Sequence, residues 1–204
     1  MEKIDMEEKR KVAADVDEVL LDFFSIMNDF YNKRFGTNLS IEDYVYYDLE
    51  KVWGCTRQKA VEIVFDFYRS QEFKQILPVK RAQKAIEILS RSNELSVVTS
   101  RPSFIEADTK NSLNKYFGNV FNEIFHNGQY GVNSSGLDKS SYCLKNGIFV
   151  ILEDNLDIAR KCAEKDITTF LFDKPWNKNS NLSSRIIRVG EKRNPWEEVL
   201  EHLK

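Results

Sequence analysis

The chain has 204 residues, of which 42% are hydrophobic and 30% are charged, and its formal net charge at pH 7 is −2. This length can bury one good core and a small additional unit, and the composition is that of a globular rather than a disordered protein. Thirty basic residues against 32 acidic ones leave no global field that would attract a nucleic-acid polymer, so phosphate must be bound at a local site.

Cysteine and histidine are sparse and scattered. The three cysteines and two histidines show no paired CxxC spacing and no metal-ligand cluster, so neither a disulfide framework nor a zinc site is predicted. The first ten residues are charged, and no stretch approaches the roughly 20 apolar residues needed to cross a bilayer. We therefore expect a cytoplasmic protein without membrane contact, whose chemistry is carried by carboxylates.

The first apolar run, residues 12–14, predicts a strand that is followed directly by Asp15 and Asp17. In strand geometry, side chains two residues apart project to the same side. Neighbouring carboxylates beside an apolar strand repel each other and lose hydration unless a cation or a shared proton compensates. Mg²⁺ would do so, because it is commonly held by one or two carboxylates together with substrate phosphate. A solvated Asp-Val-Asp turn is the alternative for this segment taken alone.

Residues 22–77 contain no convincing strand and predict several consecutive helices. Ser40 with Asp43 predicts a capping box ahead of a helix over residues 44–53, and Thr56 is a candidate cap for the next helix. This segment holds 13 of the 25 aromatic residues, which either fill the core of a small helical unit or stack on a ligand. We expect an inserted helical cap.

After residue 77, amphipathic helical stretches alternate with short apolar runs. The predicted strands are residues 12–14, 95–99, 124–125, 148–152, 168–172 and 186–189. Such alternation favours an α/β fold, whose ligands bind beyond the carboxyl ends of parallel strands. The predicted architecture is a three-layer Rossmann-like parallel sheet formed by residues 1–21 and 78–204, with the cap at 22–77. Residues 126–136 are rich in Gly, Asn and Ser and predict a loop, either near substrate or on the surface.

Polar side chains stand at three later strand ends or helix starts: Thr99, Ser100 and Arg101; Lys139; and Glu153 with Asp154. Hydroxyls and a guanidinium at a helix start form a phosphate-binding corner, and a lysine can neutralise phosphate and keep an aspartate ionised. Each segment also has a plain structural interpretation. Ser103 with Glu106 predicts a capping box, the lysine is solvated in most proteins, and Asp154 or Asn155 can cap a helix.

In order and spacing, these four segments resemble the four motifs of the haloacid dehalogenase (HAD) superfamily, over a region from about Val12 to Arg188. The helical insert resembles the C1-type cap of that superfamily. The TSRP segment at 99–102 and the run LFDKPWN at 171–177 resemble the 5′(3′)-deoxyribonucleotidase branch and its uncharacterised relatives. For Trp176 within the second run, a packing role is favoured over a place beside the pocket.

The resemblance implies that Asp15 is the nucleophile that forms an aspartyl-phosphate, and that Asp17 protonates the leaving oxygen and then activates water. It implies that Thr99 or Ser100 holds the phosphoryl group, with Arg101 as a further substrate-binding residue. Lys139 would bind substrate by balancing its charge. The implied Mg²⁺ ligands are Asp15, Asp154, the carbonyl group of Asp17 and, directly or indirectly, Glu153.

One departure from the family pattern follows the second aspartate, where many members carry Gly, Ser or Thr. This chain has Glu18, which adds bulk and negative charge near the expected phosphate site. Glu18 either points away or contacts the metal or repels substrate. The pair Glu153–Asp154 replaces an Asp-Asp pair and still offers two carboxylates.

The predicted function is an Mg²⁺-dependent phosphohydrolase for a small phosphorylated metabolite, most specifically a nucleotidase acting on nucleoside monophosphates as a monomer or homodimer. A sugar-phosphate phosphatase is the nearest alternative, because the same core carries either reaction. Two alternatives lack hydrolysis. A phosphoacceptor signalling module uses similar residues in another order, and a HAD-fold binding protein without activity would be supported by Glu18.

Overall fold

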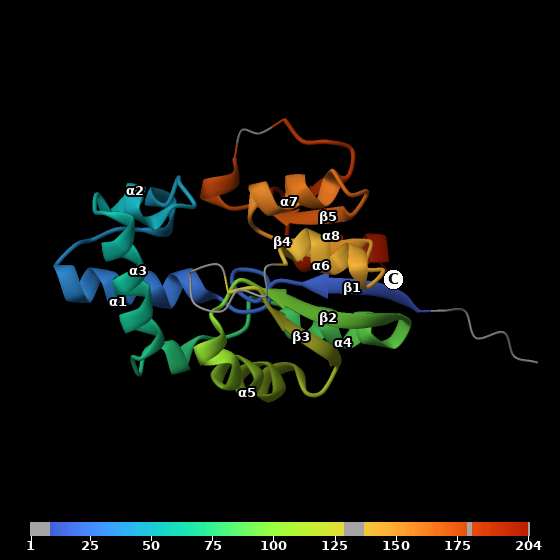
Figure 1. Ribbon diagram of the computed structural model, residues 1–204, viewed down its shortest axis with the longest axis horizontal. Helices are drawn as coiled ribbons and strands as arrows, with labels where there is room; N and C mark the ends of the chain where they lie inside the picture. Colours follow the sequence, from blue (N-terminus) through green and yellow to red (C-terminus); the bar gives the residue numbers. More distant parts are fainter. Residues whose placement is uncertain (1–8, 129–136, 179–180, 204) are drawn as a thin grey trace, which may run out of the picture.

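A computed structural model describes residues 9–128, 137–178 and 181–203 of the chain. Six strands form one parallel sheet in the order β3-β2-β1-β4-β5-β6 (Figure 1). Their bounds are Arg10–Ala14 (β1), Asn93–Thr99 (β2), Phe121–His126 (β3), Val150–Glu153 (β4), Thr168–Phe172 (β5) and Ile186–Val189 (β6). Each predicted strand is found, and the predicted three-layer α/β fold is confirmed.

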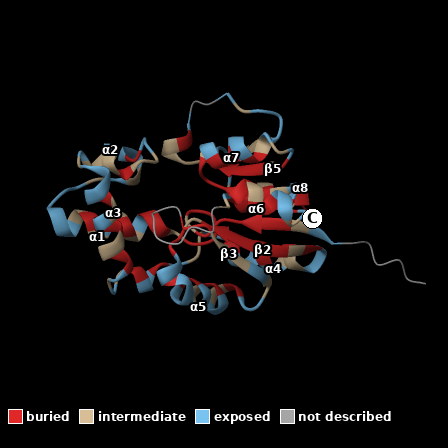
Figure 2. Cartoon of the chain, viewed as in Figure 1, coloured by how far each residue is buried: buried red, intermediate tan, exposed pale blue. Residues whose placement is uncertain are grey.

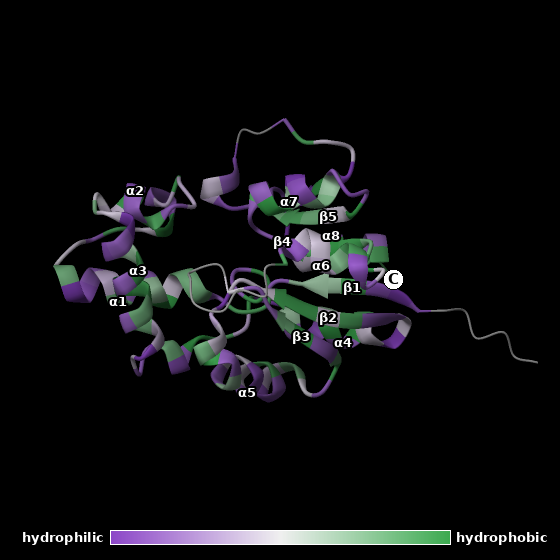
Figure 3. Ribbon diagram, viewed as in Figure 1, coloured by the Kyte–Doolittle hydropathy of each residue, from purple (hydrophilic) through white to green (hydrophobic). Residues whose placement is uncertain are grey.

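Helices cover both faces of the sheet. One face carries α6 (Lys139–Lys145) and α7 (Leu156–Ala163), and the other carries α4 (Ala82–Ser92), α5 (Glu106–Phe117) and α8 (Pro195–Leu203). Alternate residues of β1 join different cores, because Val12 and Ala14 pack with the second set of helices and Ala13 packs with the first. Strands β1, β2, β4 and β5 are therefore largely buried on both sides (Figure 2), which explains their nearly continuous apolar runs. The edge strand β3 has no buried residue. The covering helices carry both hydrophobic and hydrophilic stretches (Figure 3).

A helical insertion, residues 23–75, separates β1 from α4. It contains α1 (Phe23–Phe35), the 3₁₀ turn η1 (Ile41–Asp43), α2 (Leu49–Trp53), α3 (Arg57–Tyr68) and the 3₁₀ turn η2 (Phe73–Gln75). All of its residues are described, and none of them forms a strand. Figure 1 shows the insertion beyond the end of the sheet to which the strand arrows point. Any ligand at the carboxyl ends of the strands must therefore meet this insertion.

The two ends of the insertion leave the sheet side by side. The backbone N–H of Asp22 donates to the Leu77 carbonyl at 2.9 Å, and the N–H of Val79 donates to the Leu20 carbonyl at 2.9 Å. A bridge between Leu21 and Pro78 lies between these two bonds. These paired hydrogen bonds hold the two ends of the insertion together where the chain leaves the sheet and returns to it. That this segment acts as a cap domain remains a prediction.

The helix expected over residues 44–53 is wrong in its first half. The capping box forms, since Asp43 Oδ2 accepts from the Ser40 N–H at 2.7 Å and from the Ser40 hydroxyl at 2.9 Å, but it starts only η1. Tyr44 is buried and its hydroxyl donates to Asn28 Oδ1 at 3.0 Å, while α2 begins at Leu49. Aromatic and β-branched residues have low helix propensity, so this tertiary bond prevails over the helix.

Other local predictions have mixed outcomes. Thr56 caps α3 as expected, accepting the Lys59 N–H at 3.2 Å. The capping box of Ser103 with Glu106 does not form, because Ser103 begins a short 3₁₀ turn (η3, Ser103–Ile105) and Glu106 begins α5. Of the loop expected over residues 126–136, positions 129–136 lie outside the described residues. Across the described part of the chain, no helix is long and apolar enough to span a membrane.

Candidate active site

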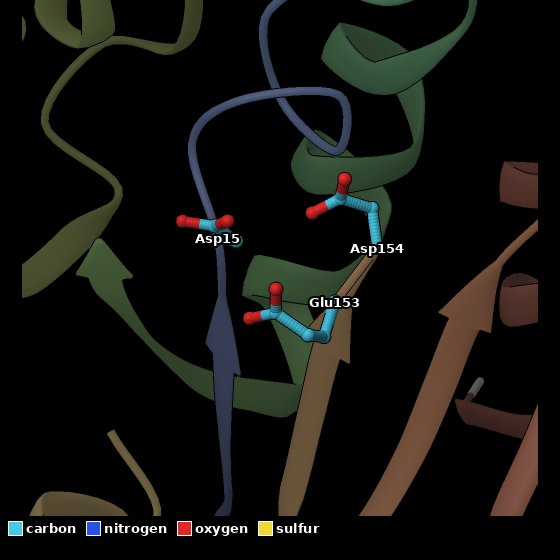
Figure 4. Close-up of side chains that lie close together, drawn as sticks. All are labelled: Asp15, Glu153 and Asp154. Atoms are coloured by element: carbon cyan, nitrogen blue, oxygen red, sulfur yellow. The ribbon is translucent and has the colours of Figure 1, made fainter. Parts of the chain in front are cut away.

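Three carboxylates converge where β1 and β4 end. Asp15 directly follows β1, Glu153 is the last residue of β4, and Asp154 follows it. One oxygen from each carboxylate lies within 4.8 Å of the others, and all three side chains are buried (Figure 4). Parallel pairing produces this convergence, since the carboxyl ends of adjacent strands meet at one edge of the sheet.

Lys139, the first residue of α6, is the cation of this cluster. Its Nζ lies 2.9 Å from Asp15 Oδ1 and 2.9 Å from Glu153 Oε2, and its side chain is only 1% exposed. Although burial opposes the charged form, the two carboxylates hold the pKa of Lys139 above its usual value. Burial raises the pKa of Asp15 to about 7; Lys139 opposes this rise, whereas Glu153 and Asp17 add to it. One lysine therefore leaves the cluster short of positive charge.

Asp17 is held by Arg101, which reaches across from the end of β2. Arg101 Nη2 donates to Asp17 Oδ1 at 2.6 Å, and Nε lies 3.1 Å from both carboxylate oxygens. The guanidinium also donates to Thr109 Oγ1 at 3.2 Å and lies 5.2 Å from the Phe73 ring centroid. Arg101 is buried, whereas Asp17 is 24% exposed. This fork fixes the orientation of the Asp17 carboxylate at the edge of the site.

The two hydroxyls that end β2 have different surroundings. Thr99 Oγ1 accepts the backbone N–H of Arg101 at 3.2 Å and is fully buried. Ser100 lines the cavity in front of Asp15, and its buried hydroxyl has no hydrogen-bond partner among the described residues. A phosphoryl oxygen would provide that partner, so the geometry favours Ser100 over Thr99 for this contact.

Glu18 turns away from the cavity. Its Oε1 accepts the N–H of Phe24 at 2.7 Å and its Oε2 lies 2.5 Å from Lys174 Nζ. Its backbone has φ +64°, in the left-handed region, which makes the tight turn after the two aspartates. Burial raises the pKa of Glu18 and Lys174 opposes the rise. The departure from the family pattern thus fixes the start of α1 and is balanced by its own lysine.

Asp154 is buried with one carboxylate oxygen tied to a tryptophan. Burial, with Glu153 and Asp15 adding to it, raises the pKa of Asp154 above its ordinary value. Asn155, not Asp154, caps α7, because its side chain accepts the N–H groups of Asp157 and Ile158 at 2.9 and 3.0 Å. Asp154 instead accepts the indole N–H of Trp176 at Oδ2, at 3.0 Å. The sequence favoured a packing role for Trp176, and its ring does pack on Phe24. The hydrogen bond to Asp154 was not predicted.

A cavity separates these groups from the helical insertion. Its polar floor consists of Asp15, Asp17, Ser100, Arg101 and Asp154. Its apolar wall consists of Phe23, Phe24, Tyr47, Leu49, Val64 and Tyr68, all from the insertion. The sheet supplies the charged groups and the insertion supplies most of the apolar surface.

The residues present suit a hard divalent cation. Four carboxylates, those of Asp15, Asp17, Glu153 and Asp154, face two buried cations, Lys139 and Arg101, which leaves an excess of negative charge. All donors are oxygens, which suits Mg²⁺ and not a soft metal. Both oxygens of Glu153 are occupied, Oε2 by Lys139 and Oε1 by the Asn155 N–H at 3.1 Å. The bonds to Asp15 both fall on Oδ1 and the bond to Asp154 falls on Oδ2, so these two residues are better placed as direct ligands.

The fold is that of HAD-type hydrolases. The HAD-like family protein SP0104 from Streptococcus pneumoniae superposes with a TM-score of 0.69 at 17% identity, covering 96% of this chain and 99% of that chain. The protein described as "putative HAD-hydrolase YfnB" from Bacillus subtilis, solved with bound magnesium, gives a TM-score of 0.63 at 15% identity, with coverages of 97% and 100%. At these identities the likeness establishes the fold.

Sequence comparison identifies the family to which the chain belongs. Residues 9–127, more than half of the chain, match the family described as 5′ nucleotidase, deoxy (Pyrimidine), cytosolic type C protein, and the chain belongs to that family. It is 26% identical over 198 residues to the protein named "Putative nucleotidase BH1399" from Halalkalibacterium halodurans, covering 94% of this chain and 91% of the relative. The chain is thus a phosphatase of the HAD superfamily, related to nucleotidases and acting on small phosphorylated substrates.

Proposed function

We propose that this phosphatase is an Mg²⁺-dependent 5′-nucleotidase that hydrolyses nucleoside monophosphates through an aspartyl-phosphate on Asp15. The observation that carries the proposal is the cavity itself, in which a polar floor with three aspartates faces an apolar wall containing four aromatic rings. The floor offers charged and polar groups for a phosphate, and the wall offers aromatic rings on which a nucleobase can stack. Family membership supports the same substrate class.

In the first step a carboxylate oxygen of Asp15 attacks phosphorus. The bond between Asp15 and phosphorus forms as the bond to the ester oxygen breaks, and the Asp17 carboxyl group gives its proton to that leaving oxygen. Arg101 holds Asp17 in place while Lys139 balances charge on Asp15. Ser100 donates to a phosphoryl oxygen at the end of β2.

In the second step water attacks phosphorus and Asp17 accepts its proton. The bond between phosphorus and Asp15 breaks, which releases inorganic phosphate and restores the Asp15 carboxylate. Asp17 suits this double role because it is the more exposed of the two aspartates, at 24% against 8% for the side chains. Water can therefore reach Asp17 while Asp15 remains shielded.

Asp15, Asp154 and the Asp17 carbonyl group would hold Mg²⁺, with Glu153 orienting Lys139 beside them. When bound, the ion offsets the repulsion between an anionic nucleophile and an anionic phosphate. The buried carboxylates themselves support this assignment. Burial raises the pKa of both Asp15 and Asp154 and so disfavours their ionised forms, which a bound cation would stabilise.

A sugar phosphate is the second candidate substrate. Its hydroxyl groups need several hydrogen-bonding partners, whereas Phe23, Phe24, Leu49 and Val64 of the apolar wall offer none from their side chains. A nucleobase gains from burial against such a surface. The alternative of a binding protein without turnover rested on Glu18, and the pairing of Glu18 with Lys174 outside the cavity lining favours the enzyme over that alternative.

The test is phosphate release from nucleoside monophosphates, sugar phosphates and p-nitrophenyl phosphate, with Mg²⁺ or with EDTA. Metal-dependent release that prefers a nucleotide supports the proposal, provided that it disappears in Asp15→Asn. Preference for a sugar phosphate would contradict the substrate assignment. Undiminished release in EDTA would contradict the metal assignment.

A further inference from the structure

The short segment after β5 contacts a residue of the proposed metal site. It forms the 3₁₀ turn η4 (Pro175–Asn177), and Asn177 anchors it. The buried side-chain amide of Asn177 donates to the carbonyl groups of Asp154 and Phe172, both at 2.8 Å. The turn is therefore fixed against the peptide that carries the Asp154 carboxylate.

Trp176, in the middle of this turn, holds the carboxylate itself. Its indole N–H lies 3.0 Å from Asp154 Oδ2. A hydrogen bond to an ionised carboxylate restricts its rotation, and a neutral donor does so without cancelling its charge. A lysine or arginine at this place would compete with a cation for Asp154, whereas an indole leaves the negative charge available.

The same turn also contacts the helical insertion. The Trp176 ring packs on Phe24 with centroids 4.6 Å apart, and Phe24 is a residue of the apolar wall at the start of α1. The backbone N–H of Phe24 is bonded to Glu18, whose other oxygen pairs with Lys174 just before the turn. Two contacts thus connect the turn to one end of α1.

Resting on the proposed function, we propose that Trp176 is a positioning residue for Mg²⁺. Its N–H holds Asp154 in the orientation that ligates the ion, and its ring fixes that orientation relative to Phe24 in the apolar wall. Loss of an outer partner of a metal ligand typically lowers metal affinity by about 10–100-fold. The expected effect of Trp176→Phe, which keeps a ring and removes the donor, is an Mg²⁺ affinity lowered by roughly tenfold.

The experiment is a titration of the substrate-free protein with Mg²⁺ at constant ionic strength, followed by calorimetry and by the rise in Tm. Trp53→Phe is the matched control, because it removes an indole N–H that donates to the Tyr44 hydroxyl at 3.3 Å inside the insertion. Trp53→Phe should bind Mg²⁺ like the wild type. Asp154→Asn should bind it far more weakly.

The outcomes separate the inference from the function on which it rests. A wild type that does not bind Mg²⁺ would overturn both. Binding that Asp154→Asn weakens but Trp176→Phe leaves unchanged would overturn only the role of Trp176. A loss of affinity in Trp176→Phe, with turnover recovering at saturating Mg²⁺, would support positioning, since a misfolded variant would not recover.

A second measurement leaves Trp176 in place. In Trp53→Phe the remaining tryptophans are Trp176 and Trp196, and Trp196 is fully buried with its N–H on the Val19 carbonyl at 3.2 Å. Saturating Mg²⁺ should therefore change the fluorescence of Trp176 in this variant. A spectrum that does not respond would contradict the contact with Asp154.

Discussion

The polar floor and the apolar wall of the cavity are held by different forces. Floor side chains are fixed by buried charges, as in the pairs Lys139–Asp15 at 2.9 Å and Arg101–Asp17 at 2.6 Å. Wall side chains are fixed by ring packing, such as Phe23 against Phe67 with centroids 5.3 Å apart. Removing one member of a buried ion pair leaves a charge unpaired, whereas replacing a ring costs only contact area. Substitutions in the floor should therefore abolish catalysis or stability, whereas substitutions in the wall can change the preferred substrate and leave the reaction intact.

The strongest test of the floor is Asp15→Asn. Because the amide is no nucleophile, turnover should fall by roughly 10⁴-fold or more. The fold should persist, since the substitution relieves repulsion from Glu153 and Asp17 at a buried position. Phosphate release and thermal unfolding measure the two effects. Turnover within tenfold of the wild type would remove Asp15 as nucleophile.

Lys139→Met should affect both activity and stability. It leaves Asp15 and Glu153 buried without their shared cation, and breaking such a buried arrangement typically costs about 3–5 kcal/mol. Urea denaturation at neutral pH without metal measures this cost. Lys145→Met, at an exposed position of the same helix, is the matched control and should change the free energy of unfolding by less than about 0.5 kcal/mol. Equal losses in both variants would contradict the role of Lys139.

The pH dependence of stability should report the titration of Asp15 in the floor. Burial raises the pKa of Asp15 from about 3.8 to about 7, so between these values the folded protein binds more protons at Asp15 than the unfolded chain does. The stability that protonated Asp15 contributes is fully present below the pKa of the unfolded chain, about 3.8, and is lost as pH rises through the pKa of the folded protein, about 7. The metal-free wild type should therefore lose Tm with rising pH more steeply than Asp15→Asn.

Mg²⁺ provides the complementary measurement. A cation binds the ionised carboxylates, so the rise in Tm that it causes should be larger near pH 8 than near pH 5. Parallel pH profiles of wild type and Asp15→Asn in EDTA and in Mg²⁺ measure both effects. Identical profiles for the two proteins would show that Asp15 does not titrate in this range.

Features of the fold and the site that leave a local pattern in the sequence could be predicted from it. Strands that alternate with amphipathic helices predict the parallel sheet, because a strand that is buried on both faces appears in the sequence as a short continuous apolar run. Motif order then placed Asp15, Lys139 and Asp154 at one edge, where the structure brings them together. These predictions succeed because each rests on a local pattern and on the rule that parallel strands end together.

Contacts between partners that are distant in sequence could not be predicted. Arg101 was predicted to bind substrate, which stays a prediction, but its contact with Asp17, 84 residues away, was not foreseen. The bond between Trp176 and Asp154 joins residues of different strand ends, and Tyr44 leaves the helical pattern because Asn28 holds its hydroxyl. Neither the hydrophobic periodicity of the sequence nor the spacing of its motifs predicts such contacts. Glu18 was ambiguous for the same reason, since Lys174 is 156 residues away.

The smallest expected effect concerns the wall. Tyr47 lines the cavity, whereas its neighbour Tyr46 does not line it and is 52% exposed. If a nucleobase stacks on Tyr47, Tyr47→Leu should lower kcat/KM for a nucleoside monophosphate by roughly 5–30-fold, corresponding to about 1–2 kcal/mol. Ribose 5-phosphate, which lacks a base, should be affected less, and Tyr46→Leu should change neither substrate. An equal loss for both substrates in Tyr47→Leu would mean that the wall supports the floor and does not select the base, and the division between the two surfaces would then fail.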